Sequence, residues 1–336
     1  MANCQVLVSL ALARDEVPLP VGLRLFLPTA WTEDAERCDE AGVAEAARTA
    51  QTKPEIALAE IDRVRAAGVR FSCVLADGGF GSSPDFRHGL DERELAWAAG
   101  IACTQLVYPT TVRLRPARTP SGRPAKHPRP SRPPRSAAEM LETQRWRRIT
   151  WRNGTKGPLN PSSCHSIRLC RMEPLASLAR FAAVRVRVAD GPSNAEGTRL
   201  PGEELWLIGE WRDSGETKYY LSNLPKRTSL RRLAAAVKAR WSCEQVHQQL
   251  KQELGLGDFE GRSWTGLHRH ALMTMIAFAF LQHLRLGARG KKRRRLTGTA
   301  APADPARGAA HAHRAPLARL DLLPALRLPA RPAPAR

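Results

Sequence analysis

The sequence predicts an α/β protein, and three features of its 336 residues point to that class. In the first hundred residues, strand-like and helix-like runs alternate, which is typical of an α/β core. Several short β-like runs follow between residues 142 and 223. Two helix-like segments, one from about residue 228 to 254 and one from about 266 to 286, complete the periodic part of the chain.

The chain opens on a predicted β-hairpin. Residues 4–13, CQVLVSLALA, have the apolar character of a strand, and a polar turn follows them. Apolar residues alternate in the second arm, residues 18–28, where prolines limit the run to an edge strand. Asp15 and Glu16 lie in the turn and are interpreted as turn formers. Because the first strand starts three residues from Met1, we expect that a neighbouring strand is missing.

A helix and two strands follow the hairpin. Thr52 and Pro54 begin a helix that ends at Gly68. Its apolar face holds Ala57, Ile61 and Val64. Residues 69–76 and 95–101 predict strands, and a short helix that begins near Ser83 and Pro84 lies between them.

The β-like runs in the middle of the chain predict a β-rich insertion. They are residues 146–151, 181–188, 204–210 and 218–221. Residues 160–177 match neither the helical nor the strand period and interrupt this region. Thr228 and Ser229 then begin one long helix that extends to about Leu254.

The positive charge is concentrated in two segments. The net charge of +21 at pH 7 is typical of proteins that bind nucleic acid or an anionic membrane. Residues 112–136, rich in Pro, Arg and Ser, and the tail at residues 287–336 supply 18 of these charges. The rest of the chain carries only about +3. The charge therefore fits a solvated linker and a disordered tail as well as it fits a DNA-binding surface.

The cysteine pattern and the hydropathy argue against other classes. Seven cysteines are scattered singly without a CxxC pair, which disfavours a disulfide framework or a zinc knuckle. The sequence has no run of 18 apolar residues, and its start lacks the basic patch and apolar core of an export signal. We therefore expect a cytoplasmic protein without a membrane partner.

Asp77 is the first residue that could carry chemistry. It stands where a hydrophobic strand gives way to Gly78 and Gly79. This position places a carboxylate at the carboxyl edge of a sheet, where the sites of open α/β proteins gather. An Asp-Gly-Gly sequence is also typical of a plain turn, so both interpretations stay open on the residues alone.

A second constellation lies in the string ARWSCEQVHQQLKQEL. Arg240, Glu244 and Lys251 are four and seven residues apart, which brings them within about 40° of one another on one face of a helix. A carboxylate between two cations suits the handling of metal and phosphate, although a salt-bridged surface stripe has the same pattern. His247 lies nearby on this face and is interpreted as a solvated or packing histidine.

Three segments carry a resemblance to a known family. They are LADGGFG around Asp77, KYYLSNLP at residues 218–225, and RWSCEQVHQQLKQELGLGDFEGRSWTGLHRHALM at residues 240–273. They resemble bacterial insertion-sequence transposases of the DDE superfamily, in the insertion sequence 701-like branch. The similarity covers roughly residues 2–286 apart from residues 160–177. It implies a ribonuclease-H-like, retroviral-integrase-like core that a β-rich insertion interrupts between the second catalytic Asp and the catalytic Glu.

The resemblance also implies roles for particular residues. Asp77 matches the second catalytic Asp and Glu244 the catalytic Glu, and both are expected to bind metal. Arg240 and Lys251 match the family's Arg, Glu, Lys signature and are expected to contact DNA phosphate. Val237 stands where many members have a Tyr. The implied partners are double-stranded DNA with terminal inverted repeats and a second copy of the chain in a synaptic complex.

The first catalytic Asp has no counterpart in this sequence. In the family it lies on the first core strand and bridges two Mg²⁺ ions, which stand about 4 Å apart and act on the attacking and leaving oxygens. This chain starts at what corresponds to the second strand. We therefore expect an N-terminally truncated core, a sheet with an unpaired edge, and a chain without strand-transfer activity.

Further candidates for DNA contact are less specific. Trp151, Trp206 and Trp211 could stack on a flipped base, and core packing is the simpler explanation for each. Candidates for phosphate contact that no spacing singles out are Lys156, Arg212 and Lys218.

We expect the chain to divide into five regions. Residues 1–110 and 226–286 form the two parts of the core, 111–140 a basic linker, 141–225 the insertion and 287–336 a disordered tail. Three functions stay open: a transposase that is catalytically defective, a non-catalytic DNA-binding remnant that regulates transposition, and an unstable pseudogene product.

Overall fold

The computed structural model describes residues 5–14, 17–116, 128–150, 153–154, 157–158, 179–194 and 197–297. The chain divides into two units, Met1–Gly287 and Ala288–Arg336, and the fold described below is that of the first unit. Several predictions lie outside the described residues and stay predictions. They concern Asp15, Glu16, Trp151, Lys156 and residues 160–177.

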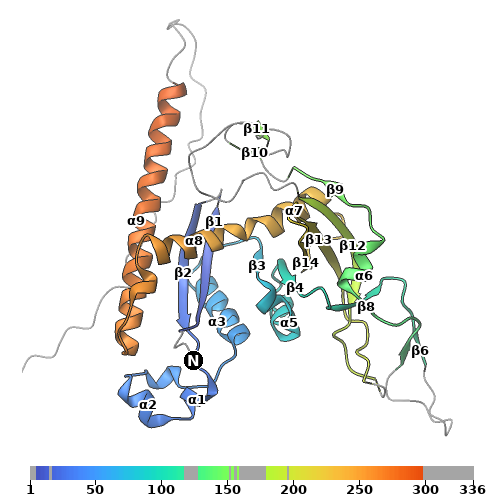
Figure 1. Cartoon of the computed structure of the whole chain (residues 1–336), viewed down its shortest axis with the longest axis horizontal. Coiled ribbons are helices and arrows are strands. Elements are labelled where there is room, and N and C mark those ends of the chain that lie inside the picture. The colour runs from blue at the N-terminus through green and yellow to red at the C-terminus, as the bar shows by residue number, and fades with distance from the viewer. Residues whose placement is uncertain are drawn as a thin grey trace, which may run out of the picture. The chain divides into compact units, whose positions relative to one another are not determined.

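The largest element is a mixed sheet of eight strands (Figure 1). Along the main path the order is β3 (Val74–Ala76), β4 (Trp97–Ile101), β14 (Thr217–Ser222), β13 (Glu204–Trp211), β12 (Arg180–Val188), β5 (Leu106–Pro109) and β8 (Arg135–Ser136), and β9 (Arg147–Arg148) pairs with β12. Only β3 and β4 are parallel. The β-like runs at 181–188, 204–210 and 218–221 are confirmed as strands, and they continue the same sheet as β3 and β4.

The predicted hairpin is present, but it does not join this sheet. β1 (Leu7–Arg14) pairs antiparallel with β2 (Val17–Leu25), with a register shift between Leu10 and Ala11. Among the described residues, these two strands pair only with each other. Two more small antiparallel pairs are β6 (Leu114–Arg115) with β7 (Arg129–Pro130) and β10 (Asn153–Gly154) with β11 (Gly157–Pro158).

Two helices cover one side of the hairpin and the sheet. In α3 (Lys53–Ala66), Thr52 and Glu55 form the capping box that helix starts favour, and Gly68, with φ +79°, follows its end. α5 (Pro84–Glu92) is capped by Ser83. The shorter helices are α1 (Thr29–Thr32), α2 (Ala35–Glu40), η1 (Glu45–Ala47), α4 (Gly78–Gly81), α6 (Ala137–Glu142) and η2 (Leu256–Asp258).

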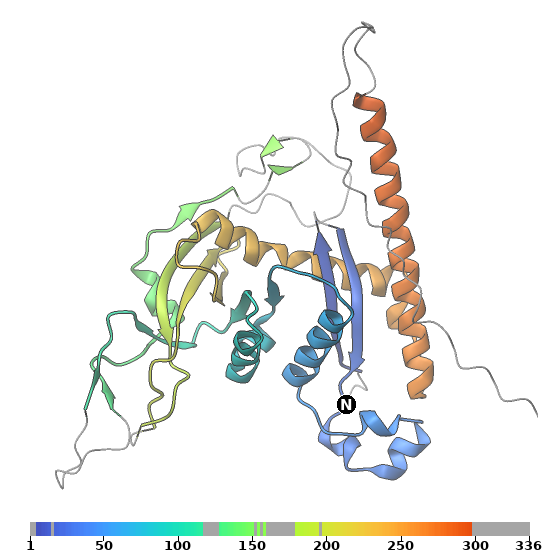
Figure 2. The same ribbon diagram turned by 180° about the vertical axis from the view of Figure 1, so that it is seen from behind.

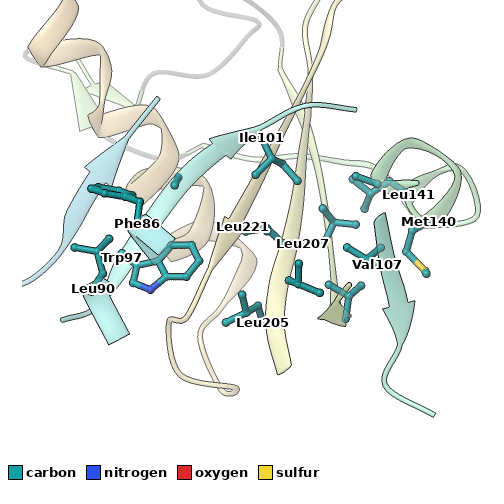
Figure 3. Packing of buried hydrophobic residues seen from close by; sticks show 14 of the residues in the cluster. Phe86, Leu90, Trp97, Ile101, Val107, Met140, Leu141, Leu205, Leu207 and Leu221 are labelled. Carbon is teal, nitrogen blue, oxygen red and sulfur yellow. The ribbon is translucent and has the colours of Figure 1, made fainter. Parts of the chain in front are cut away.

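The main hydrophobic core lies between these helices and the sheet. Figure 3 shows Phe86, Leu90 and Trp97 packed in the same cluster as Leu207 and Leu221 of the central strands. Trp97 and Leu207 are fully buried. Leu10 of β1 packs against this cluster, so the separate hairpin still shares the core of the larger sheet.

The predicted long helix at residues 228–254 is wrong in one respect, because it is two helices. α7 (Leu230–Ala239) begins at the predicted cap Ser229, and α8 (Trp241–Gln252) begins directly after it, with Arg240 at the junction. α7 packs on β3, β4, β12 and β13, whereas α8 packs on β1 and β2. The bend at Arg240 thus lets one segment cover both the sheet and the hairpin (Figures 1 and 2).

Other boundaries also differ from the prediction. The strand expected at residues 69–76 is reduced to Val74–Ala76. The last helix, α9, runs from Trp264 to Thr297 and so extends beyond the predicted end at about residue 286. The segment at 112–136, predicted to be a linker, contains β6, β7 and β8. Within the described part of the chain, no helix has the length and apolar character to cross a membrane.

Candidate functional site

Asp77 follows β3 and caps the short helix α4. Its Oδ1 accepts hydrogen bonds from the backbone N–H groups of Gly79, at 3.0 Å, and Phe80, at 3.3 Å. The turn and the site interpretations of Asp-Gly-Gly are therefore compatible, because one carboxylate oxygen closes the turn while the side chain stays exposed.

The glycines after Asp77 allow α4 to lie directly against β4. A Cβ atom at Gly81 would stand 2.0 Å from the carbonyl oxygen of Gly100, and a Cβ at Gly100 would stand 2.9 Å from the backbone nitrogen of Gly78. Only glycine fits such an approach of two backbones. This close packing fixes the position of Asp77 relative to the sheet.

The first turn of α8 carries the second candidate carboxylate. Glu244 forms an ion pair with Arg240, in which Oε1 accepts from the guanidinium group. The Glu244 side chain is 62% exposed and the Arg240 side chain 22%, so the carboxylate is accessible while the cation is largely covered. The ion pair between Arg240 and Glu244 agrees with the interpretation of this stripe as a salt-bridged helix surface.

Asp77 and Glu244, which are 167 residues apart in the sequence, both act electrostatically on one side chain, that of Cys243. Burial raises the pKa of the Cys243 thiol, and the charges of Arg240, Glu244 and Asp77 all act on it. One thiol therefore feels both carboxylates and the guanidinium group. Lys251, in the last turn of α8, lies about 10 Å along the helix from Glu244.

His247 connects this site to the hairpin. Its Nε2 lies 2.6 Å from Oγ of Ser9 on β1. Burial lowers the pKa of His247, the charge of Lys251 lowers it further, and Glu244 opposes this effect. The imidazole therefore packs between α8 and β1, in agreement with the packing interpretation, and its hydrogen bond joins α8 to β1 next to Glu244.

A buried ionic network joins β13 to α7, and the sequence analysis did not predict it. Glu210 on β13 is fully buried. It accepts hydrogen bonds from Lys238 of α7 at 2.8 Å, Tyr220 of β14 at 2.8 Å and Arg212 at 3.1 Å. Burial raises the pKa of Glu210, but the charge of Lys238 and the donors around the carboxylate outweigh it and hold that pKa below its usual range. The signal was a Glu inside the apolar strand ELWLIGEW.

The part of the chain that contains Asp77 matches a known protein family. Residues 1–158 match the DDE superfamily endonuclease family. The match supports the DDE transposase family, and the mixed α/β fold with its mixed sheet is consistent with a ribonuclease-H-like DDE domain. No curated protein matches the chain. Asp77 lies within the matched residues. The match ends at residue 158, so α8 with Arg240, Glu244 and Lys251 lies outside it.

The two described tryptophan candidates lie on opposite faces of the sheet. Trp206 faces α7, donates a hydrogen bond to the carbonyl oxygen of Pro225 at 3.2 Å, and has Arg185 over its ring at 5.2 Å. Trp211 lies on the other face, packs edge-on against Trp146 and is 41% exposed. The two rings therefore do not form one stacking surface.

The cations proposed for phosphate contact in this region have protein partners. Arg212 pairs with Glu210 at 3.1 Å and with Glu216 at 3.4 Å, and Lys218 lies 3.8 Å from Glu216. Val237 is buried in the core between α7 and the sheet.

The donor set at the site is short of what two Mg²⁺ ions require. DDE endonucleases generally use divalent metal ions, and hard cations of this kind bind carboxylate oxygens. Asp77 and Glu244 supply two carboxylates, one oxygen of Asp77 is engaged by backbone N–H groups, and Glu244 is paired with Arg240. Among the residues that the structure describes, no group of three His, Cys, Asp or Glu side chains could hold a metal ion. We therefore derive no metal-dependent step from these residues alone.

Proposed function

We propose that this chain is the catalytic part of a bacterial insertion-sequence transposase of the insertion sequence 701-like branch. Its substrate is double-stranded DNA at terminal inverted repeats, with Asp77 and Glu244 as catalytic carboxylates. Two observations carry the proposal: Asp77 is an exposed carboxylate at the end of β3, and α8 presents the exposed Glu244 paired with Arg240, with the charges of all three acting on the Cys243 thiol. The match of residues 1–158 to DDE superfamily endonucleases supports the same chemistry.

The charges of the site suit a phosphodiester substrate. Two exposed carboxylates favour hard divalent cations, and the guanidinium group of Arg240 is a geometric match for a phosphate. In the structure this guanidinium pairs with Glu244. We infer that Arg240 is the cation nearest the two carboxylates that could contact phosphate, and that Lys251 provides a second cation farther along α8. Trp211, the exposed ring of the two tryptophans, is our candidate for stacking on a base.

We propose that the site needs a third carboxylate, which a further strand would bring. β3 is an end strand of its sheet among the described residues, and its free edge faces away from β4. A strand that paired parallel to β3 would end beside Asp77, where the carboxyl ends of parallel strands collect. Without that strand, we propose that the chain binds DNA but does not cut or join it.

The test combines DNA binding with cleavage. The chain is mixed with a supercoiled plasmid and with a labelled duplex, with and without Mg²⁺, and both nicking and binding are measured. We expect salt-sensitive binding and no nicking. Mg²⁺ should tighten duplex binding by the unaltered chain and have a smaller effect on a variant with Asp77→Asn and Glu244→Gln. Robust Mg²⁺-dependent nicking or joining would refute the claim that the site is incomplete.

A matched control separates the site from the overall charge. Glu253→Gln removes a carboxylate from the other end of α8, at an exposed position. This variant should keep the full effect of Mg²⁺ on DNA binding. If it loses that effect as completely as the variant without Asp77 and Glu244, then Mg²⁺ acts through general charge and the assignment of the two carboxylates is wrong.

The second candidate function is DNA binding without any catalytic role, as in a regulator of transposition. It is favoured by the incomplete donor set at the site. It predicts the same lack of nicking, but it also predicts that Mg²⁺ changes duplex binding equally for the unaltered chain and for the variant without Asp77 and Glu244.

A further inference from the structure

α9 has a second apolar face in addition to the one that packs on the protein. Its buried residues Leu267, Ala271, Thr274, Phe278 and Gln282 recur every three or four positions, as expected for one stripe of a helix. Ala271 and Phe278 pack with Val246 and Leu250 of α8 and with Leu23 of β2. Figures 1 and 2 show α9 lying beside α8 and the hairpin.

The other face of α9 exposes large apolar side chains. Leu272, Ile276, Phe280 and Leu284 are 55%, 53%, 60% and 51% exposed, and the adjacent Met273 is 65% exposed. At about 100° per residue, these five side chains fall within an arc of about 120° that is centred opposite the buried stripe. A helix that is apolar on both sides is normally buried on both sides, so this face lacks a partner within the described unit.

We propose that this face, which we call the α9 outer face (Leu272, Met273, Ile276, Phe280 and Leu284), binds the α9 outer face of a second copy of the chain. Four of its residues are spaced regularly by four, so the row is nearly symmetric about position 278, with Leu at both ends and Ile and Phe in the middle. An antiparallel partner related by a two-fold axis would set Leu272 against Leu284 and Ile276 against Phe280. Such a self-complementary patch is what an isologous dimer requires.

The area of the α9 outer face agrees with this partner. Each of its side chains leaves at least half of its surface exposed, so the five together present roughly 500 Å² of apolar surface, given that a large side chain offers ~150–200 Å². Two copies would bury about 1,000 Å², the lower bound for a specific interface. A patch of this size lies at the upper end of what monomers expose and usually has a function.

The surrounding charge determines how salt should act on the dimer. The sequence of α9 contains no Asp or Glu, and the chain carries +21 at pH 7. Two copies therefore repel each other, and added salt screens this repulsion while leaving apolar contacts intact. The dimer should become stronger as the salt concentration rises, whereas DNA binding should become weaker. This inference does not depend on Asp77, Glu244 or the proposed nuclease function.

The first experiment measures the oligomeric state of the DNA-free chain by sedimentation over a series of protein and salt concentrations. We expect a reversible dimer for the unaltered chain. Ile276→Glu combined with Phe280→Glu should weaken it by about a hundredfold or more, because each copy would bury two unpaired charges. The control Gln252→Glu adds a charge at an exposed site on α8, away from the α9 outer face, and should leave the dimer intact. Thermal unfolding of each variant checks that the fold is kept.

The second experiment tests the orientation. Leu272→Cys and Leu284→Cys chains are oxidised separately and as a mixture, against the background of the natural cysteines. Antiparallel pairing should give a new cross-link only in the mixture, because the two Leu272 positions of such a dimer lie about 18 Å apart along the helices. Cross-links within each separate sample would overturn the antiparallel arrangement. A monomer at all concentrations, or binding of this face to anionic lipid vesicles instead, would overturn the proposal.

Discussion

The β12–β13–β14 strands and the β1–β2 hairpin are both antiparallel, yet they are held in different ways. The central strands are paired on both edges and covered by α7 on one face and by the main core on the other. The hairpin is attached to the rest of the unit by side chains, among them Leu10 in the core and Ser9 on His247. We therefore expect stability to concentrate in the sheet, while the candidate carboxylates come from the end of β3 and from α8, the helix that packs on the hairpin.

The largest expected effect is in the sheet. Glu210→Gln would remove the charge that balances Lys238 in a buried position, and breaking a buried pair in this way should lower the free energy of unfolding by about 3 kcal/mol. Urea denaturation measures it. Glu216→Gln, at a side chain that is 53% exposed, is the control and should change stability by less than about 0.5 kcal/mol. Equal effects would show that the buried network does not stabilise the sheet.

The same carboxylate sets an acid limit for the sheet. The pKa of Glu210 is lower in the folded protein than in the unfolded chain. Its contribution is therefore complete above the unfolded pKa and is lost as the pH falls through the folded value. Thermal melting is measured between pH 6 and pH 3, because an unfolded glutamate titrates at about 4.3 and the folded Glu210 below that value. As the pH falls, the melting temperature of the unaltered chain should drop more steeply than that of Glu210→Gln.

The packing of α4 on β4 should tolerate one glycine substitution and not another. Gly81→Ala would place a Cβ 2.0 Å from a backbone oxygen that cannot move aside, and should cost about 2 kcal/mol. At Gly78 the nearest atom to a new Cβ is 4.0 Å away, so Gly78→Ala should be nearly neutral. Denaturation of both variants checks this. Similar losses would mean that close approach is not what positions Asp77.

The hairpin should open more easily than the sheet. Ser9→Ala removes the hydrogen bond to His247 and should cost about 1 kcal/mol. Native-state hydrogen exchange should show this loss mainly at the amides of β1 and β2, with little change in β13. A loss of protection spread evenly over both regions would contradict the view that the hairpin is a separate, weaker body.

The smallest expected effect is the pH response of the same contact. The pKa of His247 is lowered in the folded protein, so protonation favours the unfolded chain and stability falls as the pH drops below the ordinary imidazole value of about 6.5. The charged groups that act on the ring are Lys251 and Glu244. Between pH 7 and pH 5, protonation of His247 should lower the free energy of unfolding of the unaltered chain by less than about 1 kcal/mol. The His247→Gln variant should not show this loss, and thermal melting of both proteins over this pH range measures the difference.

Local patterns predicted most of the elements but not how they assemble. The capping residues Thr52 and Ser83 and the stop at Gly68 placed α3 and α5 correctly, because these signals act within a few residues. The division of the 228–254 helix at Arg240 was not predictable from periodicity. Arg240 keeps helical dihedral angles, and the bend reflects the two different surfaces on which α7 and α8 pack.

The candidate site shows the same limit. The resemblance singled out Asp77 and Glu244, and the structure brings their charges to one thiol. Glu210 and the contact between Ser9 and His247 could not be found in this way, because they join residues that only the folded sheet brings together. The partners of Trp206 and Trp211 likewise depended on strand register, which places residues five apart on opposite faces of β13.

The helix junction at Arg240 also separates the surfaces to which the two candidate carboxylates are attached. α7 is fastened to the sheet through Lys238 and Glu210, whereas α8 rides on the hairpin. Asp77 therefore follows a strand of the large sheet, whereas Glu244 lies on the helix that packs on the hairpin. The spacing of the two carboxylates therefore depends on how the hairpin packs against the sheet, so a substitution in that packing can alter the site without changing either carboxylate.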